Sequence, residues 1–206
     1  MFQPRIWLLI LMICVPAALR IVDHPWNVAP MGALALFAGA CFRHKAWAFI
    51  VPLAAMLLSD IGIGLTRGNS AFYTFHSTTT LVYLSYALSV GLGMAVRGYW
   101  KRSDAGSRRD KFRLGAWLGT RVLPLASATL AGALVFFFVT NFGVWALMPT
   151  YPKTWEGLVH CYTAGLPFFR NTLGGDVFYV VVLFGGFGLL RDKVGVFQES
   201  DLLVTE

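Results

Sequence analysis

The sequence predicts an all-α polytopic membrane protein that folds as a single bundle of six transmembrane helices. Of its 206 residues, 57% are hydrophobic and only 13% are charged, whereas about a quarter of the residues in soluble domains are charged. The hydrophobic residues are gathered in runs close to the roughly 20 residues that a helix needs to cross a bilayer. Most of the basic residues lie in the short connections between these runs.

The runs predict helices over residues 5–22, 28–42, 46–66, 77–96, 118–140 and 173–190, all within one transmembrane domain that spans 1–206. The first run has the length of a signal peptide. However, Arg20, Asp23, His24 and Pro25 follow it, where cleavage would require small residues, so we interpret it as a retained helix. The second run is short, which makes it the least suited to a full crossing.

The second run is also rich in small residues, with Ala35 and Gly39 four positions apart in PMGALALFAGACF. Small residues let helices approach closely in lipid, where packing drives their association. Two interpretations follow. The small residues can serve packing inside the bundle, or they can form a smooth surface on which another membrane subunit docks.

The basic residues predict the orientation of the chain. The connection 97–115 holds seven Lys or Arg residues, and basic connections stay in the cytoplasm. Alternating from there places both termini inside, with thirteen Lys or Arg on the cytoplasmic side and four outside. The longest outer connection is then 141–172. The tryptophans agree with this topology, with Trp7, Trp47, Trp100 and Trp117 at the inner boundary and Trp26, Trp145 and Trp155 at the outer one.

Carboxylate, amide and histidine side chains are concentrated on the outer side of this topology. Ionisable groups in or near membrane spans usually face a bundle interior or a watery cavity, so we expect a pocket that opens outward. We expect Arg170 to suit a carboxylate or phosphate on a ligand. The candidate ligand-binding residues are Asp60, His76, Asn141, Arg170, Asn171 and Asp176.

Some of these residues have structural alternatives. Asp60 needs a partner at its depth in the third helix, and Arg20 or Arg170 could form an ion pair with it. Asp176 is placed in the first turn of the last predicted helix, where a carboxylate interacts favourably with the helix N-terminus. Asn171 could cap the same helix.

A metal site has little support in the sequence. The three cysteines do not make a disulfide framework. His76, His160 and Cys161 are expected on one side of the membrane and are weak candidates for metal ligands. We expect no resident cofactor.

Motifs of other protein classes are absent from the sequence. It contains no Walker motif, no H-E-x-x-H, no G-x-S-x-G and no Cys-x-x-Cys. It also lacks the arginine ladder of a voltage sensor and the filter sequence of a potassium channel. We therefore expect no enzyme. We expect no nucleic-acid partner either, because the net charge of +7 comes mostly from short connections and is not spread over a folded face.

Several stretches carry a resemblance to a known group of proteins: WNVAPMGALALFAGACF, FIVPLAAMLLSDIGIG, VYLSYALSVGLG, TNFGVW and YPKTWEGLVHCYTAGLPFFRNTLGGD. They resemble a family of small bacterial inner-membrane proteins without an assigned function, over about residues 20–190. This resemblance implies a multi-pass protein of the bacterial inner (cytoplasmic) membrane.

The six-helix architecture is in turn similar to the S components of energy-coupling factor transporters. That similarity implies capture of a micronutrient from outside, either a vitamin such as cobalamin or a metal. It also implies a transmembrane coupling subunit and ATPases as partners. Neither Cys161 nor His76 can be matched to the cobalt-ligating cysteine of the cobalamin-type S components.

Two other functions remain open. The chain could be a membrane accessory or assembly protein that does not transport, with a structural cluster of polar residues on its outer side. It could also be a membrane-embedded enzyme with a catalytic pair formed by Asp60 and Asp176, although no further motif supports such chemistry.

Overall fold

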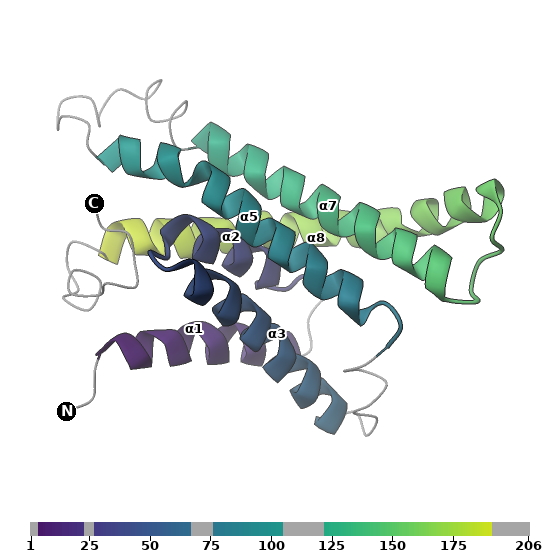
Figure 1. The fold of residues 1–206 in the computed structure, drawn as a ribbon, viewed down its shortest axis with the longest axis horizontal. Helices are drawn as coiled ribbons and strands as arrows, with labels where there is room; N and C mark the ends of the chain where they lie inside the picture. Colours follow the sequence, from purple (N-terminus) through teal and green to yellow (C-terminus); the bar gives the residue numbers. More distant parts are fainter. Residues whose placement is uncertain (1–3, 23–26, 67–75, 105–121, 191–206) are drawn as a thin grey trace.

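The fold is all-helical, as predicted. A computed structural model describes residues 4–22, 27–66, 76–104 and 122–190, and these form six helices (Figure 1). The helices are α1 (Pro4–Ile21), α2 (Met31–Cys41), α3 (Lys45–Thr66), α5 (Thr79–Asp104), α7 (Leu123–Leu147) and α8 (Trp155–Leu190).

Four helices are long and apolar enough to cross a membrane: α3, α5, α7 and α8. Large hydrophobic side chains are exposed along them, including Leu58, Leu88, Phe138 and Val181. Exposed apolar surface on this scale would be unfavourable in water, and it matches the hydrocarbon that surrounds a membrane protein. The helix lengths and the exposed surface together define a membrane protein.

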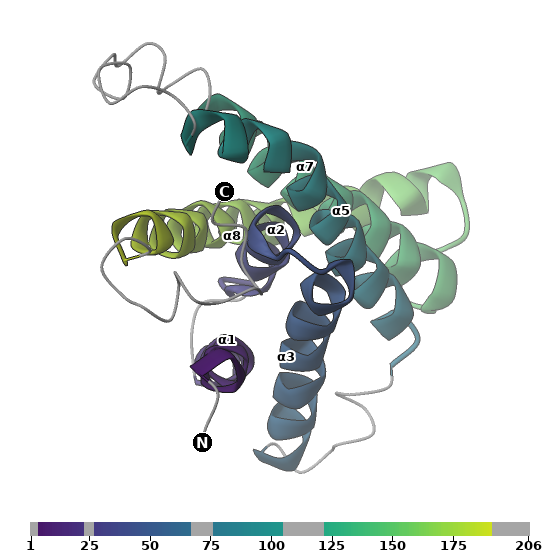
Figure 2. The same ribbon diagram turned by 60° about the vertical axis from the view of Figure 1, so that its left-hand side comes forward.

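The helix α2 lies at the centre of the bundle. Ten of its eleven residues are buried, and it contacts α3, α5, α7 and α8 (Figure 2). At about 1.5 Å per residue it is about 17 Å long, roughly half of the ~30 Å hydrocarbon core. The helix predicted over 28–42 is thus shorter than expected and is not among the helices long enough to cross a membrane. It packs against other helices instead of facing lipid.

Two glycines set the crossing of α2 with α5. A Cβ added at Gly93 would lie 3.0 Å from the Cα of Gly39, and one added at Gly39 would lie 2.9 Å from the Cα of Gly93. Such distances are shorter than real Cβ contacts, so both positions need glycine for the backbones to approach this closely. The small residues of α2 thus serve packing inside the bundle. The alternative of a docking surface on this helix was wrong, because α2 has almost no exposed surface.

The carboxyl end of α2 is held by an arginine from α5. The Arg97 guanidinium donates to the carbonyl oxygens of Gly39 and Phe42, with Nη2–O distances of 2.7 and 2.6 Å. Its Nε donates to the Gly39 oxygen as well, at 3.2 Å. The last carbonyls of a helix lack partners within it and carry partial negative charge. Arg97 supplies both the hydrogen bonds and the opposite charge.

The structure replaces the predicted outer loop 141–172 with a helical hairpin. The helix α7 continues to Leu147 and α8 begins at Trp155, so only 148–154 connects them. Pro167 lies inside α8, although proline usually interrupts a helix. Hydrogen bonds join the two arms: the Cys161 thiol donates to the Asn141 carbonyl at 3.3 Å, and the Tyr162 hydroxyl donates to the Phe138 carbonyl at 2.9 Å.

The hairpin extends beyond the other helices at one end of the molecule (Figure 1). The helix α8 has 36 residues, a length of about 54 Å. Its first residues are capped by Thr154, whose hydroxyl accepts from the Gly157 N–H at 3.2 Å. The predicted last helix, 173–190, is only the second half of this element.

The basic connection predicted over 97–115 begins later than expected. The helix α5 continues through Asp104, so residues 97–104 are helical, and 105–121 lie outside the described residues. The fifth predicted helix, 118–140, corresponds to α7, which begins at Leu123.

Candidate functional site

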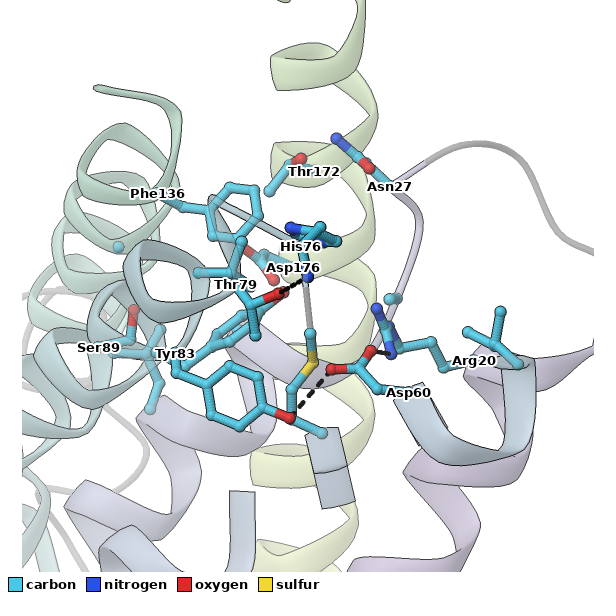
Figure 3. A pocket seen from close by; sticks show the side chains of 18 residues that line it. Arg20, Asn27, Asp60, His76, Thr79, Tyr83, Ser89, Phe136, Thr172 and Asp176 are labelled. Atoms are coloured by element: carbon cyan, nitrogen blue, oxygen red, sulfur yellow. Dashed lines mark hydrogen bonds and ion pairs between the residues drawn. The ribbon is translucent and has the colours of Figure 1, made fainter. Parts of the chain in front are cut away.

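A cavity of about 600 Å³ lies between the helices. Its walls come from α1, α2, α3, α5, α7 and α8, and from the segments that precede α2 and α5 (Figure 3). Both polar and apolar side chains face it. The lining residues are Arg20, Asn27, Ala29, Gly32, Leu36, Met56, Asp60, Ile63, His76, Thr79, Val82, Tyr83, Tyr86, Ser89, Gly132, Phe136, Thr172 and Asp176.

An ion pair joins α1 to α3 on one wall of the cavity. The Arg20 Nη1 lies 2.5 Å from Asp60 Oδ1 and 2.7 Å from the Ser59 hydroxyl. The other carboxylate oxygen of Asp60 accepts from the Tyr83 hydroxyl of α5 at 3.0 Å, and Figure 3 shows Tyr83 pointing toward it. The Asp60 side chain is only 5% exposed. A carboxylate this buried is tolerated because both of its oxygens have partners.

A second carboxylate, Asp176 from α8, lies against the amino end of α2. Asp176 is 5% exposed and accepts a hydrogen bond from the Ala33 N–H. A Cβ added at Gly32 would lie 2.8 Å from the Asp176 Cγ, so only glycine leaves room for this approach. The residue that precedes α2, Pro30, makes no side-chain cap. Asp176 therefore caps α2 from another helix, where a negative charge is favourable.

His76 is held at the entry to α5. Its Nδ1 lies 3.1 Å from the Thr78 hydroxyl, and its backbone N–H donates to the Thr79 hydroxyl at 3.1 Å. Figure 3 shows the His76 ring on the same side of the cavity as Thr172 and Asn27. These contacts orient an imidazole at the cavity wall.

Asn27 lines the cavity from the segment that leads into α2. Its φ is +63°, a left-handed conformation that asparagine tolerates better than most residues because its short polar side chain can bond locally. The chain then passes close to α8, where a Cβ at Gly175 would lie 3.2 Å from the Cα of Val28. Gly175, directly before Asp176, thus lets this segment pack against the helix.

Much of the polar lining comes from one face of α5. Thr79, Tyr83, Tyr86 and Ser89 are spaced by four, three and three residues, which places them along one helical stripe. The Tyr86 ring packs against Phe136 of α7, with centroids 5.3 Å apart. These residues were missing from the sequence-based candidates, although the periodicity of polar and aromatic positions in this helix could have indicated them.

The structure brings together three of the six predicted ligand-binding residues. Asp60, His76 and Asp176 line the cavity, and Asn141, Arg170 and Asn171 are not among its lining residues. The Asn141 amide donates to the Phe137 carbonyl of its own helix at 2.8 Å. Arg170 and Asn171 lie on α8, and Arg170 is exposed.

The structural roles considered for Asp60, Asp176 and Asn171 differ in how they compare with the structure. Of the two arginines proposed as partners of Asp60, Arg20 forms the pair. Asp176 does lie at a helix N-terminus, but at that of α2 and not of its own helix. Asn171 is in the interior of α8 and does not precede it, so its predicted capping role was wrong.

The weak metal candidates do not come together. His76 lines the cavity, whereas the Cys161 thiol is bonded inside the α7–α8 hairpin and the adjacent His160 is exposed. Within the described parts of the chain, no group of three or more His, Cys, Asp or Glu residues could hold a metal ion.

These features define the class of the molecule: a helical membrane protein with a polar cavity inside its bundle. The chain belongs to the family of unknown function DUF6580, whose pattern it matches over residues 1–199. Comparison with curated proteins and with solved structures finds no match.

Proposed function

We propose that this protein binds a small molecule, a micronutrient such as a vitamin, in the cavity between its helices, and takes it up from the outer side of the membrane. The observation that carries the proposal is the cavity itself. Its volume of about 600 Å³ falls within the 300–1,000 Å³ of typical small-molecule sites. Its lining combines apolar and aromatic side chains with polar groups that could orient a ligand.

The cavity volume favours a compact ligand. A site of this size suits a molecule with one or two rings, whereas a corrinoid such as cobalamin is a macrocycle with a nucleotide tail and is much larger. Of the micronutrients considered from the sequence, a small vitamin therefore fits better than cobalamin. The metal alternative loses support because the described residues gather no metal-binding group.

The position of the cavity supports outward opening. His76 and Thr79 are at the beginning of α5, while Arg97 and the basic residues that follow it are toward the other end of that helix. Phe42 contacts Arg97, so the exposed Arg43 next to it belongs to the same basic end of the bundle. Because basic ends face the cytoplasm, the cavity opens toward the opposite side.

The sequence has no nucleotide-binding motif, so ATP hydrolysis that drives release of the ligand to the cytoplasm would have to come from partner proteins. A transmembrane coupling subunit with ATPases, as in energy-coupling factor transporters, would supply it. The proposal extends this architecture by analogy, because function does not follow from fold alone.

A second candidate, the accessory or assembly protein that does not transport, is favoured by one observation. Asp60 and Asp176 both have structural partners, Arg20 and the N-terminus of α2. In this candidate function the polar groups stabilise the bundle and the cavity holds only water or lipid.

The test is to extract the protein from membranes in a mild detergent and identify bound small molecules by native mass spectrometry. A Gly132→Leu variant serves as the cavity-filling comparison. A Cβ at Gly132 makes ordinary contacts, 3.4 Å from the Ser89 Oγ and 4.0 Å from the Leu92 Cδ1, so a larger side chain there extends into the cavity. Gly91→Leu is the matched control, because nothing lies within 4 Å of a Cβ at Gly91.

We expect a stoichiometric small molecule on the wild-type protein and on Gly91→Leu, and its loss from Gly132→Leu. A ligand that remains bound to Gly132→Leu does not occupy the cavity. Wild-type protein that carries no small molecule under any growth condition contradicts the binding function and favours the accessory protein.

A further inference from the structure

The charges around the cavity identify the class of ligand. We propose that the cavity selects a small organic cation with a flat ring, and that the Asp176 carboxylate is its counter-ion. This inference rests on the proposed function, and it goes further by assigning the charge and shape of the ligand.

The positive groups at the cavity are already compensated. Arg20 is the only Lys or Arg among the described lining residues, and its guanidinium is paired with Asp60 and Ser59. The other positive feature, the amino end of α2, is covered by the Asp176 carboxylate. An anionic ligand would therefore have to displace a carboxylate of the protein from its partner, which leaves a buried charge unpaired.

The negative charges are not balanced to the same extent. The described lining residues hold two carboxylates and one guanidinium, a formal charge of −1 with His76 neutral. Asp60 accepts from Arg20 on one oxygen and from Tyr83 on the other. Asp176 accepts from the Ala33 N–H, while an ionised carboxylate has about four acceptor sites. Asp176 also lines the cavity, so a donor bound there can approach its carboxylate.

Aromatic rings complete the recognition of a cation. Tyr86 and Phe136 form a pair with centroids 5.3 Å apart and both line the cavity, as does Tyr83. A flat cation placed over such rings is attracted by their negative faces, and the attraction is stronger when water is excluded. The same rings stack against a flat ligand.

The carboxylate and the aromatic rings line the same cavity and together form one binding site. Asp176 lies on α8 beside the amino end of α2, and the aromatic residues lie on α5 and α7, so a ring held between these helices can present its cationic group to the carboxylate. A neutral molecule of the same shape would keep the stacking and lose the ion pair. An anion of the same shape would also be repelled.

Three molecules with the same pyridine ring test this directly: the 1-methylnicotinamide cation, neutral nicotinamide and the nicotinate anion. Their affinities for the purified full-length protein are measured by calorimetry in detergent. We expect the cation to bind about tenfold more tightly than nicotinamide, and nicotinate to bind most weakly. We expect Asp176→Asn to remove the preference for the cation over nicotinamide, while Glu156→Gln, which removes an exposed carboxylate from the same helix, preserves it.

The outcomes separate this inference from the proposed function. Equal binding of all three molecules, tightest binding of nicotinate, or binding of none of them overturns the cation site. An unchanged preference in Asp176→Asn also overturns it. The proposed function is decided separately, by whether the extracted protein carries any small molecule in its cavity. If Asp176→Asn does not fold, a Phe136→Leu variant tests the aromatic contribution, and its cation affinity is expected to fall more than its nicotinamide affinity.

Discussion

Asp176 and Arg97 lie at opposite ends of α2 and neutralise its two poles. The carboxylate contacts the amino end of the helix and the guanidinium binds the carbonyls at its carboxyl end. The helix is about 17 Å long, shorter than the ~30 Å hydrocarbon core, so at least one of its ends lies at membrane depth. Unsatisfied backbone groups there cost several kcal/mol each. Two charged residues from other helices thus allow a short helix to lie inside the bundle.

The cap at the carboxyl end of α2 can be tested at Arg97. We expect Arg97→Ala to lower the free energy of unfolding by about 2–3 kcal/mol, because it leaves the carbonyls of Gly39 and Phe42 without their charged donor. Arg97→Lys should recover only part of this, since an ammonium cannot reproduce the fork of donors. Unfolding in mixed detergent micelles provides the measurement, and Lys45→Ala, at an exposed position, is the control. Equal stability of Arg97→Ala and Lys45→Ala would contradict the cap.

The contact between α2 and α5 predicts opposite effects on stability for alanine substitutions at two glycines of α5, Gly93 and Gly91. Gly93→Ala places a Cβ 3.0 Å from both the Gly39 Cα and the Ala40 N, which forces the helices apart and is expected to cost about 3 kcal/mol or more. Gly91→Ala meets nothing within 4 Å and is expected to be neutral or stabilising by up to about 1 kcal/mol. Thermal unfolding of the two variants side by side measures the difference. A Gly93→Ala protein as stable as Gly91→Ala would show that the helices do not cross at this point.

We expect the ion pair between Arg20 and Asp60 to give a large coupling energy in a double-mutant cycle. Asp60→Asn and Arg20→Gln each leave a charge without its partner, at a cost of about 3 kcal/mol for the more buried group. The double variant should be more stable than the sum of the single effects predicts, by about 1–3 kcal/mol. Tyr83→Phe, which removes only one hydrogen bond to Asp60, should cost about 1 kcal/mol. Additive effects in this double-mutant cycle would mean that the two charges do not interact.

The orientation of the bundle can be tested by labelling cysteines. Ser77→Cys introduces an exposed thiol next to His76 at the cavity end, and Ala46→Cys introduces one at the basic end. The background carries Cys14→Ser, because Cys14 is exposed whereas Cys41 and Cys161 are buried. We expect a membrane-impermeant maleimide to label Ser77→Cys in intact spheroplasts, and Ala46→Cys only after permeabilisation. The reverse pattern would place the cavity on the cytoplasmic side.

The segment Gly165–Gly186 illustrates what local signals could not predict. Pro167, Arg170 and Asn171 resemble the end of a loop, and Gly174 and Gly175 resemble the start of a helix. The chain is nevertheless helical from Trp155 to Leu190. The hydrogen bonds of Cys161 and Tyr162 to α7 stabilise the first half of this helix, and such contacts between distant residues override local propensity.

The residues of the candidate site were also predicted only in part from the sequence. Asp60, His76 and Asp176 stood out because ionisable residues are rare in membrane helices, and all three line the cavity. Tyr83, Tyr86 and Phe136 did not stand out, since aromatic residues are common throughout such a chain. Arg170 stood out for its charge, yet it is an exposed residue of α8 and does not line the cavity.

The sequence by itself determined the class of the protein, because the hydrophobic effect acts on composition and run length without reference to any partner. Its hydrophobic runs also located most of the helices. Only the tertiary structure decided that α2 is an internal helix, that Asp176 caps that helix instead of its own, and that Arg20 is the partner of Asp60. These relationships join residues tens of positions apart through distances and directions in space, and no local pattern of residues records them.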